Sequence, residues 1–332
     1  MILVLVEHAD GRAERLTLEA LTFARRLAGG GPGADAAIDA VLVGPGAGEA
    51  AATLGGWGIA TAHVAEDDRL SAFAPAAWAA ALDAAIDALA PTAVLAAGSD
   101  RGNEIMAHVG ARTGLPMAAN ILDTERAETT AAPLRLTRQR WAGSLLEDAV
   151  LDTPTKLLTM APHAVAAEAM ESAGAAPSIA PLAVELTDDD LRVAVARRLE
   201  PDRTGIALGD ARVVVGGGRG VGSAEAFSEL EELAGLLGAA VGVSRVVTSS
   251  GWRPHSQQIG QTGARIAPDL YIACGISGAI QHIVGAKAAK RILVINTDPE
   301  APIMAVADYA VIGDLHQVVP AISAEIRRAA GG

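Results

Sequence analysis

Two arginine-containing segments in the last third of the chain, one of them rich in glycine, have the residue types that bind an anionic, planar ligand. The expected strand 212–215, whose last three residues are Val, is followed by Gly216–Gly220, which includes Arg219, and a second apolar run is followed by Ser244 and Arg245. Glycines let a phosphate or a ring approach the backbone closely. An Arg guanidinium suits planar, delocalised anions. Each segment indicates a ligand contact, although each taken alone also fits an ordinary turn.

Two further segments add hydrogen-bond donors. Residues 257–263 combine amides, glycines and the Thr262 hydroxyl, which together could meet the edge of a heterocycle. Residues 275–282 follow an apolar run and open a helical pattern, with Gln281 and His282 near its start. The N-terminus of a helix carries free N–H groups and the positive end of a dipole, so it favours an anion.

Polar residues also follow the apolar runs 292–295 and 309–312. These are Asn296–Pro299 after the first run and Gly313–Leu315 after the second. In an open α/β sheet, ligands bind outside the carboxyl ends of the strands. We therefore expect all of these segments to converge on one crevice.

Known catalytic signatures are missing from the sequence. Gly216–Gly220 fails the dinucleotide pattern G-x-G-x-x-G, because Val221 and Ser223 stand where the third glycine would be. The sequence contains no G-x-S-x-G, H-E-x-x-H or Walker A motif. A site with many ligand contacts but few acids and bases indicates that a cofactor does the chemistry. An NAD-linked oxidoreductase that uses the same crevice is the alternative from another class.

The order of apolar and helical patterns predicts an α/β protein. Residues 2–6 form a wholly apolar run, typical of a strand buried on both faces, and residues 14–28 follow at helical spacing. Such alternation continues to about residue 113, and short strands with turns are expected over 115–185. The C-terminal part repeats the alternation, with strands expected at 212–215, 241–243, 270–273, 292–295 and 309–312 and helices at 224–237, 278–289 and 315–328.

These elements predict two domains, each an open, mostly parallel sheet with flanking helices. The N-terminal α/β domain is expected over 1–200 and a linker over 201–210. A Rossmann-like nucleotide-binding layer is expected over 211–332. A length of 332 residues agrees with two domains of about 150 residues each.

Composition excludes several classes of protein. A net charge of −13 argues against a nucleic-acid binder, which needs a basic surface. Cys274 is the single cysteine, so neither an internal disulfide nor a cysteine metal cluster can form, and no metal site is expected. No apolar stretch reaches the roughly 18 residues that span a bilayer, and the first residues lack the features of a signal peptide. We expect a cytosolic or matrix-like protein that is not an integral membrane protein, and we assign it to the bacterial cytoplasm.

Several long sequence motifs over 211–325 resemble those of the electron transfer flavoprotein alpha subunit family, and the opening residues 4–20 are also similar to it. Residues 115–200 resemble it loosely. These motifs occur in the same order as in the family: Gly216–Gly220, Ser244–Arg245, Gly260–Gly263, Leu270–Ala273, Gly275–His282, Ile295–Ile303, Ala307–Tyr309 and Gly313–Asp314.

The resemblance implies that the C-terminal domain is a Rossmann-like FAD-binding layer. It places Thr262 near flavin N5 and His282 near the flavin C2 carbonyl. Arg245 or His282 beside the ring would stabilise the negative charge of a reduced flavin. The implied FAD contacts are Arg219, Ser244, Arg245, Ile259, Gly260, Gln261, Thr262, Ser277, Gly278, Ala279, Ile280, Gln281, His282, Asn296, Asp314 and Leu315.

The resemblance also implies partners. The family works as a heterodimer with a beta subunit, which carries AMP or, in bifurcating members that oxidise NADH, a second FAD. It is an electron carrier rather than an enzyme. It takes electrons from flavoprotein dehydrogenases, such as the acyl-CoA dehydrogenases of fatty acid β-oxidation, and passes them to the membrane electron transfer flavoprotein-ubiquinone oxidoreductase. A flavin-free interaction subunit is a further alternative.

The chain departs from the family pattern at two places beside the expected ring. Thr248-Ser249-Ser250 stands where the family usually has Val-Asp-Ala, and Ala264 stands where Lys commonly follows Gln-Thr-Gly. We expect these departures to change the redox tuning rather than FAD binding itself.

Overall fold

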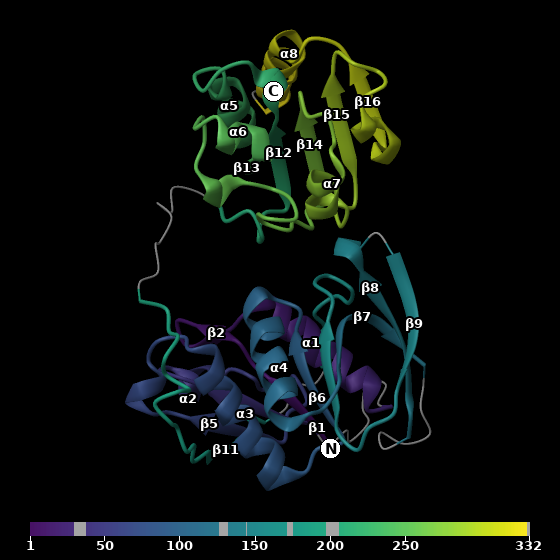
Figure 1. Ribbon diagram of the computed structural model, residues 1–332. Helices are drawn as coiled ribbons and strands as arrows, with labels where there is room; N and C mark the ends of the chain where they lie inside the picture. Colours follow the sequence, from purple (N-terminus) through teal and green to yellow (C-terminus); the bar gives the residue numbers. More distant parts are fainter. Residues whose placement is uncertain (30–37, 126–131, 144, 171–174, 197–205, 331–332) are drawn as a thin grey trace. The chain divides into compact units, whose positions relative to one another are not determined.

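The computed structural model describes residues 1–29, 38–125, 132–143, 145–170, 175–196 and 206–330. The chain divides into two compact units, Met1–Arg198 and Leu199–Gly332, which are described separately (Figure 1). The expected domain limits at 200 and 211 stay a prediction, because half of the expected linker, 201–205, lies outside the described residues.

A nine-stranded sheet forms the N-terminal unit. Its order is β11-β5-β4-β1-β6-β10-β7-β8-β9, with parallel pairing from β11 to β7 and antiparallel pairing of β7 with β8 and of β8 with β9. The expectation of a mostly parallel sheet is confirmed. The strands are β1 (Ile2–Leu5), β4 (Ile38–Val43), β5 (Thr61–Ala65), β6 (Ala93–Ala97), β7 (Met117–Thr124), β8 (Leu134–Arg140), β9 (Leu145–Leu151), β10 (Lys156–Met160) and β11 (Ser178–Pro181), and the short pair β2 (His8–Ala9) and β3 (Arg12–Ala13) stands apart.

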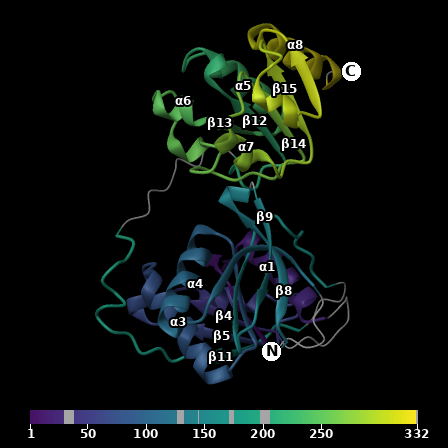
Figure 2. The ribbon, with the colours of Figure 1, turned by 45° about the vertical axis from the view of Figure 1, so that its right-hand side comes forward.

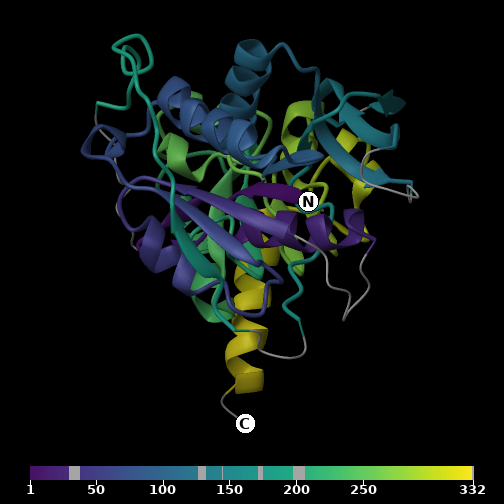
Figure 3. The ribbon, with the colours of Figure 1, turned by 90° about the horizontal axis from the view of Figure 1, so that it is seen from below.

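Helices cover both faces of this sheet. Ile2 and Val4 of β1 pack in one apolar cluster with residues of α1 (Arg15–Leu27) and α2 (Ala47–Ala52). Leu3 and Leu5 pack in a second cluster with α3 (Pro75–Leu89) and α4 (Asp100–Thr113). Figure 3 shows these two helical layers on either side of the strands. The wholly apolar β1 is thus buried on both faces, as its pattern predicts.

Arg112, in the last turn of α4, joins two acidic side chains. Its Nη1 lies 2.6 Å from Asp190 Oδ1, and its Nε donates to Asp83 of α3. We expect Arg112→Met to lower the free energy of unfolding by about 2 kcal/mol, because two partly buried carboxylates lose their partner. Urea unfolding measures this loss, and limited proteolysis should find the chain newly cut near Asp190.

Arg192→Met is the matched control. Arg192 pairs with Asp189, and both side chains are about three-quarters exposed. Exposed pairs contribute little. If the two variants lost the same free energy of unfolding, the idea that Arg112 stabilises the fold by pairing with Asp83 and Asp190 would be contradicted.

The C-terminal unit has a five-stranded, all-parallel sheet with the order β13-β12-β14-β15-β16. Figure 2 shows β12, β14 and β15 side by side. One face packs against α5, α6 and α8, and the other packs against α7 and the loops beside it. The elements are β12 (Val213–Gly217), α5 (Phe227–Leu237), β13 (Ala240–Val243), α6 (Arg245–Ser249), β14 (Leu270–Cys274), α7 (Ile280–Ala286), β15 (Ile292–Asn296), β16 (Tyr309–Ile312) and α8 (Leu315–Ala330).

The strand β12 corrects one detail of the sequence analysis. It extends through Gly216 and Gly217, which were expected in a loop. A Cβ on Gly216 would lie 2.5 Å from the Tyr271 ring, and one on Gly217 would clash with the Phe227 ring. These glycines therefore allow two large aromatic side chains, Tyr271 of β14 and Phe227 of α5, to pack closely on β12, and they do not form a turn.

Within the described residues, no helix is both long and apolar enough to cross a membrane.

Candidate cofactor site

A pocket of about 300 Å³ opens at the carboxyl edge of the C-terminal sheet. Three segments line it: the start of α6 after β13, the loop 258–262, and the loop from β14 into α7. The lining residues are Ser244, Arg245, Val246, Ser249, Gln258, Ile259, Gly260, Gln261, Thr262, Ile276, Ser277, Gly278, Ala279, Gln281 and His282.

Glycines hold the loop 258–262 close against α7. Gly260 has φ +142°, a backbone conformation that side chains rarely adopt. A Cβ on Gly285 of α7 would lie 2.5 Å from Gly260 Cα. The N–H of Gln261 donates to the Gln281 carbonyl at 2.8 Å. Two lining segments are thereby joined backbone to backbone.

His282 has one ring nitrogen in a good hydrogen bond and one that is not. Its side chain is 6% exposed, and its Nε2 lies 2.8 Å from the hydroxyl of Tyr271. Its Nδ1 is buried and makes no hydrogen bond of good geometry with a described residue. Burial lowers the pKa of His282 to about 4, and a weaker backbone hydrogen bond between the ring and Ile259 opposes this shift, so the ring is neutral at pH 7. A buried polar atom without a good partner is typical of a site that binds a ligand.

Thr262 is oriented by a buried amide. The Nε2 of Gln258 donates to Thr262 Oγ1 at 3.0 Å, and Gln258 Oε1 accepts from Thr248 Oγ1 at 2.7 Å. Thr248 Oγ1 also lies 2.9 Å from the Arg245 carbonyl, so these contacts fix where the Thr262 hydroxyl sits in the pocket. Thr248 stands at a departure from the family pattern, and the usual Val could not make this bond.

Arg245 brings positive charge to the pocket rim. It is the first residue of α6, and its side chain is exposed. The guanidinium makes no hydrogen bond or ion pair with any residue that the structure describes. The preceding Ser244 is fixed by its N–H, which donates to the Gly217 carbonyl at 3.0 Å. An unpaired guanidinium on an ordered backbone suits an anionic ligand.

The structure brings together most of the residues predicted to contact FAD. Those that line the pocket are Ser244, Arg245, Ile259, Gly260, Gln261, Thr262, Ser277, Gly278, Ala279, Gln281 and His282.

The other five predicted contacts lie outside this lining. Arg219 and Ile280 have exposed side chains, and Leu315 is buried in the cluster beneath α8. Asn296 donates to the Ile276 carbonyl at 3.0 Å, and Asp314 accepts from the N–H of His316. Asn296 is the last residue of β15, and Asp314 follows β16, at the same sheet edge as the pocket. Their contacts to FAD stay a prediction.

Sequence reasoning did not single out Tyr271 or Gln258, the two side chains that orient His282 and Thr262. Tyr271 stands in an apolar strand, where it looks like an ordinary core residue. The signal that could have found it is Gly216, a glycine inside the neighbouring strand.

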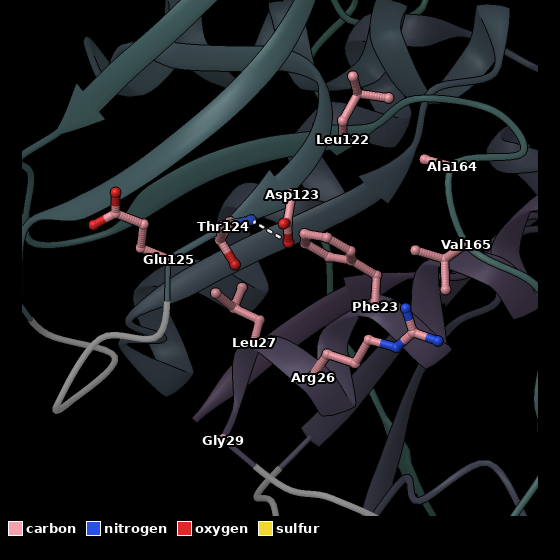
Figure 4. Close-up of a pocket in the computed structure, with 10 residues that line it drawn as sticks. All are labelled: Phe23, Arg26, Leu27, Gly29, Leu122, Asp123, Thr124, Glu125, Ala164 and Val165. Atoms are coloured by element: carbon pink, nitrogen blue, oxygen red, sulfur yellow. Dashed lines mark hydrogen bonds between the residues drawn. The ribbon is translucent and has the colours of Figure 1, made fainter.

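A second, larger pocket of about 530 Å³ lies in the N-terminal unit, between the end of α1 and β7. Figure 4 shows the Phe23 ring between Asp123 and Val165, with Arg26 and Glu125 on opposite sides. Arg26 already pairs with Glu168 at 3.5 Å, and Glu125 borders residues outside the described part. Among the described residues, no group of acids, histidines and Cys274 could hold a metal ion. These polar groups do not converge, so the C-terminal pocket is the candidate site.

Comparisons with known proteins match both units. Residues 207–287 match the electron transfer flavoprotein FAD-binding domain, and residues 2–185 match the electron transfer flavoprotein domain. The chain is similar to electron transfer flavoprotein subunit alpha of Bacillus subtilis, with 34% identity covering 98% of this chain and 97% of the relative. It is similar to the subunit alpha of Mycobacterium leprae, with 38% identity covering 99% of each chain. The corresponding protein of Syntrophomonas wolfei is 35% identical over 98% of each.

Proposed function

Since the chain belongs to the electron transfer flavoprotein alpha subunit family, we propose that it binds one FAD in the C-terminal pocket and carries electrons as half of a heterodimer. The observation that carries this proposal is the buried Nδ1 of His282, which makes no hydrogen bond of good geometry with a described residue and belongs to the lining of a pocket at the carboxyl edge of a parallel sheet. This family membership confirms the resemblance found in the sequence.

The pocket fits the ring portion of FAD. Gly260 and Gly278 take backbone conformations that favour glycine, and a Cβ on either would meet Gln281 or Ile303, so the missing side chains let the lining loops pack closely. Thr262 and His282 offer polar groups, and Arg245 offers positive charge. When bound, FAD supplies reversible acceptance of one or two electrons.

The remaining predicted contacts extend the site along the sheet edge. We propose that Ser277 to His282 bind the pyrophosphate and ribityl chain. Asn296, Asp314 and Leu315 would bind the adenosine end, and Arg219 the phosphates. The positions of Asn296, at the end of β15, and of Asp314, just after β16, support an extended ligand.

The lining favours a carrier over an acid–base enzyme. Among the described residues that line the pocket, Arg245 and His282 are the titratable ones, and burial keeps His282 neutral. Neither is suited to transfer a proton near pH 7. The residues hold, orient and charge-balance the cofactor, and the chemistry is left to it.

The partners follow from the same proposal. The other half of the heterodimer would be a beta subunit that binds AMP or a second FAD. The electron donors would be flavoprotein dehydrogenases, such as those for acyl-CoA thioesters. The acceptor would be a membrane quinone oxidoreductase that the carrier meets from the bacterial cytoplasm.

Co-purification with the beta subunit tests the proposal. The heterodimer should be yellow, and nucleotide analysis after denaturation should find one FAD for each alpha chain, in addition to AMP or a second FAD from the partner. A folded, colourless heterodimer that does not take up added FAD would refute the proposed function.

Arg245 provides a sharper test. We expect Arg245→Ala to weaken FAD binding about tenfold, or roughly 1.4 kcal/mol, because an unpaired cation is lost from the pocket rim. The reduction potential should also fall, since reduced flavin is more negative. Fluorescence titration and potentiometry measure the two effects. Arg328→Ala, at an exposed pair with Glu325 on α8, should change neither.

A further inference from the structure

We propose that Tyr271 is a positioning residue that fixes His282 as a hydrogen-bond donor to FAD through its Nδ1–H. The inference rests on the proposed FAD site, and it assigns a role to a side chain that does not line the pocket. It further distinguishes His282, as a neutral donor, from Arg245, which is a cation.

The Tyr271 hydroxyl has a single partner. Tyr271 lies in β14, its side chain is fully buried, and its Oη is 2.8 Å from His282 Nε2. The hydroxyl makes no other hydrogen bond within the described residues. The missing side chain of Gly216 makes room for the ring, since a Cβ there would lie 2.5 Å from it. The neighbouring strand β12 therefore leaves space for the Tyr271 ring at Gly216.

The direction of the hydrogen bond follows from counting protons. If Nε2–H donated to the phenol, the buried O–H of Tyr271 would have no acceptor. A buried donor without an acceptor is strongly disfavoured. If the phenol donates to Nε2, both atoms are satisfied and the imidazole proton must lie on Nδ1. Because His282 lines the cofactor pocket and its Nδ1 has no good partner among the described residues, a ligand in the pocket is the acceptor that this proton lacks.

The protonation states agree with this direction. Burial lowers the pKa of His282 to about 4, so a second imidazole proton is not present at neutral pH. Burial raises the pKa of Tyr271 above its ordinary value, so the phenol keeps the proton that it donates. A neutral ring with Nδ1–H is suited to a carbonyl oxygen or another acceptor at the flavin edge.

Tyr271→Phe in the FAD-loaded heterodimer tests the inference, because Phe keeps the ring and removes the donor. We expect nitrogen NMR of the wild type to show His282 with an unprotonated Nε2 and a protonated Nδ1. In Tyr271→Phe the two tautomers should mix, FAD affinity should fall about five- to tenfold, and the reduction potential should shift. A purely structural role would leave the tautomer unchanged.

Tyr309→Phe is the matched control. Tyr309 is the second of the two tyrosines in the chain and lies on β16 of the same unit, where it is 61% exposed. The Tyr309→Phe variant should leave the His282 tautomer, the FAD affinity and the reduction potential unchanged.

Two results would overturn the inference: a wild-type His282 protonated at Nε2, or a Tyr271→Phe variant with the wild-type tautomer and potential. The first result needs no variant, so it decides the matter even if Tyr271→Phe does not fold. A wild-type heterodimer without FAD would instead refute the proposed function.

Discussion

Replacing Gly285 by Ala is expected to weaken FAD binding about a hundredfold. The new Cβ would lie 2.5 Å from Gly260 Cα, so the loop 258–262 would have to move away from α7. Gly260 itself has a φ of +142° and cannot adapt easily. Overpacking of this kind costs about 3 kcal/mol, and here the displaced segment carries Gln261 and Thr262 of the pocket.

Fluorescence titration of the heterodimer with FAD measures the loss, and circular dichroism tests whether the chain still folds. Gly235→Ala is the control, because Gly235 lies in α5 and a Cβ there meets nothing within 4 Å. That change should stabilise the helix by about 0.5–1 kcal/mol and leave FAD binding intact. Wild-type affinity in Gly285→Ala would show that the contact between loop and helix does not shape the site.

Glu7→Gln should stabilise the N-terminal unit at alkaline pH by on the order of 3 kcal/mol. Glu7 follows β1 and is 2% exposed, and its Oε1 accepts from Ser99 Oγ at 2.5 Å. Burial raises the pKa of Glu7 from 4.5 to about 7, with smaller contributions from the charges of Glu14 and Asp100, while the Ser99 hydrogen bond opposes the shift. The folded protein therefore favours the protonated carboxyl.

The sign of the pH dependence follows from this shift. A folded state that binds the proton more tightly than the unfolded chain keeps its full stability below about pH 4.5 and loses it as the pH rises through 7. Gln resembles the protonated acid and removes the loss. Urea unfolding at pH 5 and pH 8 should therefore show a gain for Glu7→Gln at pH 8 and little gain at pH 5. Glu104→Gln, at an exposed position on α4, should show neither effect.

Much of the fold follows from sequence pattern. The wholly apolar run at 2–6 and the alternation of strand and helix predict parallel sheets, and the observed β4, β6, β14 and β15 fall at or within a residue of the expected strands. These elements are predictable because burial on both faces leaves an uninterrupted apolar run. The five-residue helix α6 was not predicted, since so short a segment has no helical period.

The candidate site was predictable in part. Polar and glycine residues after successive strands predict a shared edge, and most of the predicted contacts do line one pocket. The hydrogen bonds that hold these lining residues in place were not predictable from the sequence. The contact of Tyr271 with His282, and that of Gln258 with Thr262, join side chains whose orientation depends on the final packing. Arg219 and Ile280 show the converse, because a position in the right segment does not settle where a side chain points.

The place of β10 in the N-terminal sheet has a consequence for synthesis on the ribosome. This strand, Lys156–Met160, lies between β6 and β7, although both precede it in the chain. While the chain is growing, β7 cannot be joined to β6 through β10 until residue 160 has emerged. The meander β7-β8-β9 is then made before the strand that attaches it to the rest of the sheet. Non-local pairing of this kind slows folding and leaves strand edges exposed meanwhile. A nascent chain stalled before Lys156 should therefore depend on chaperones more than one stalled after Met160.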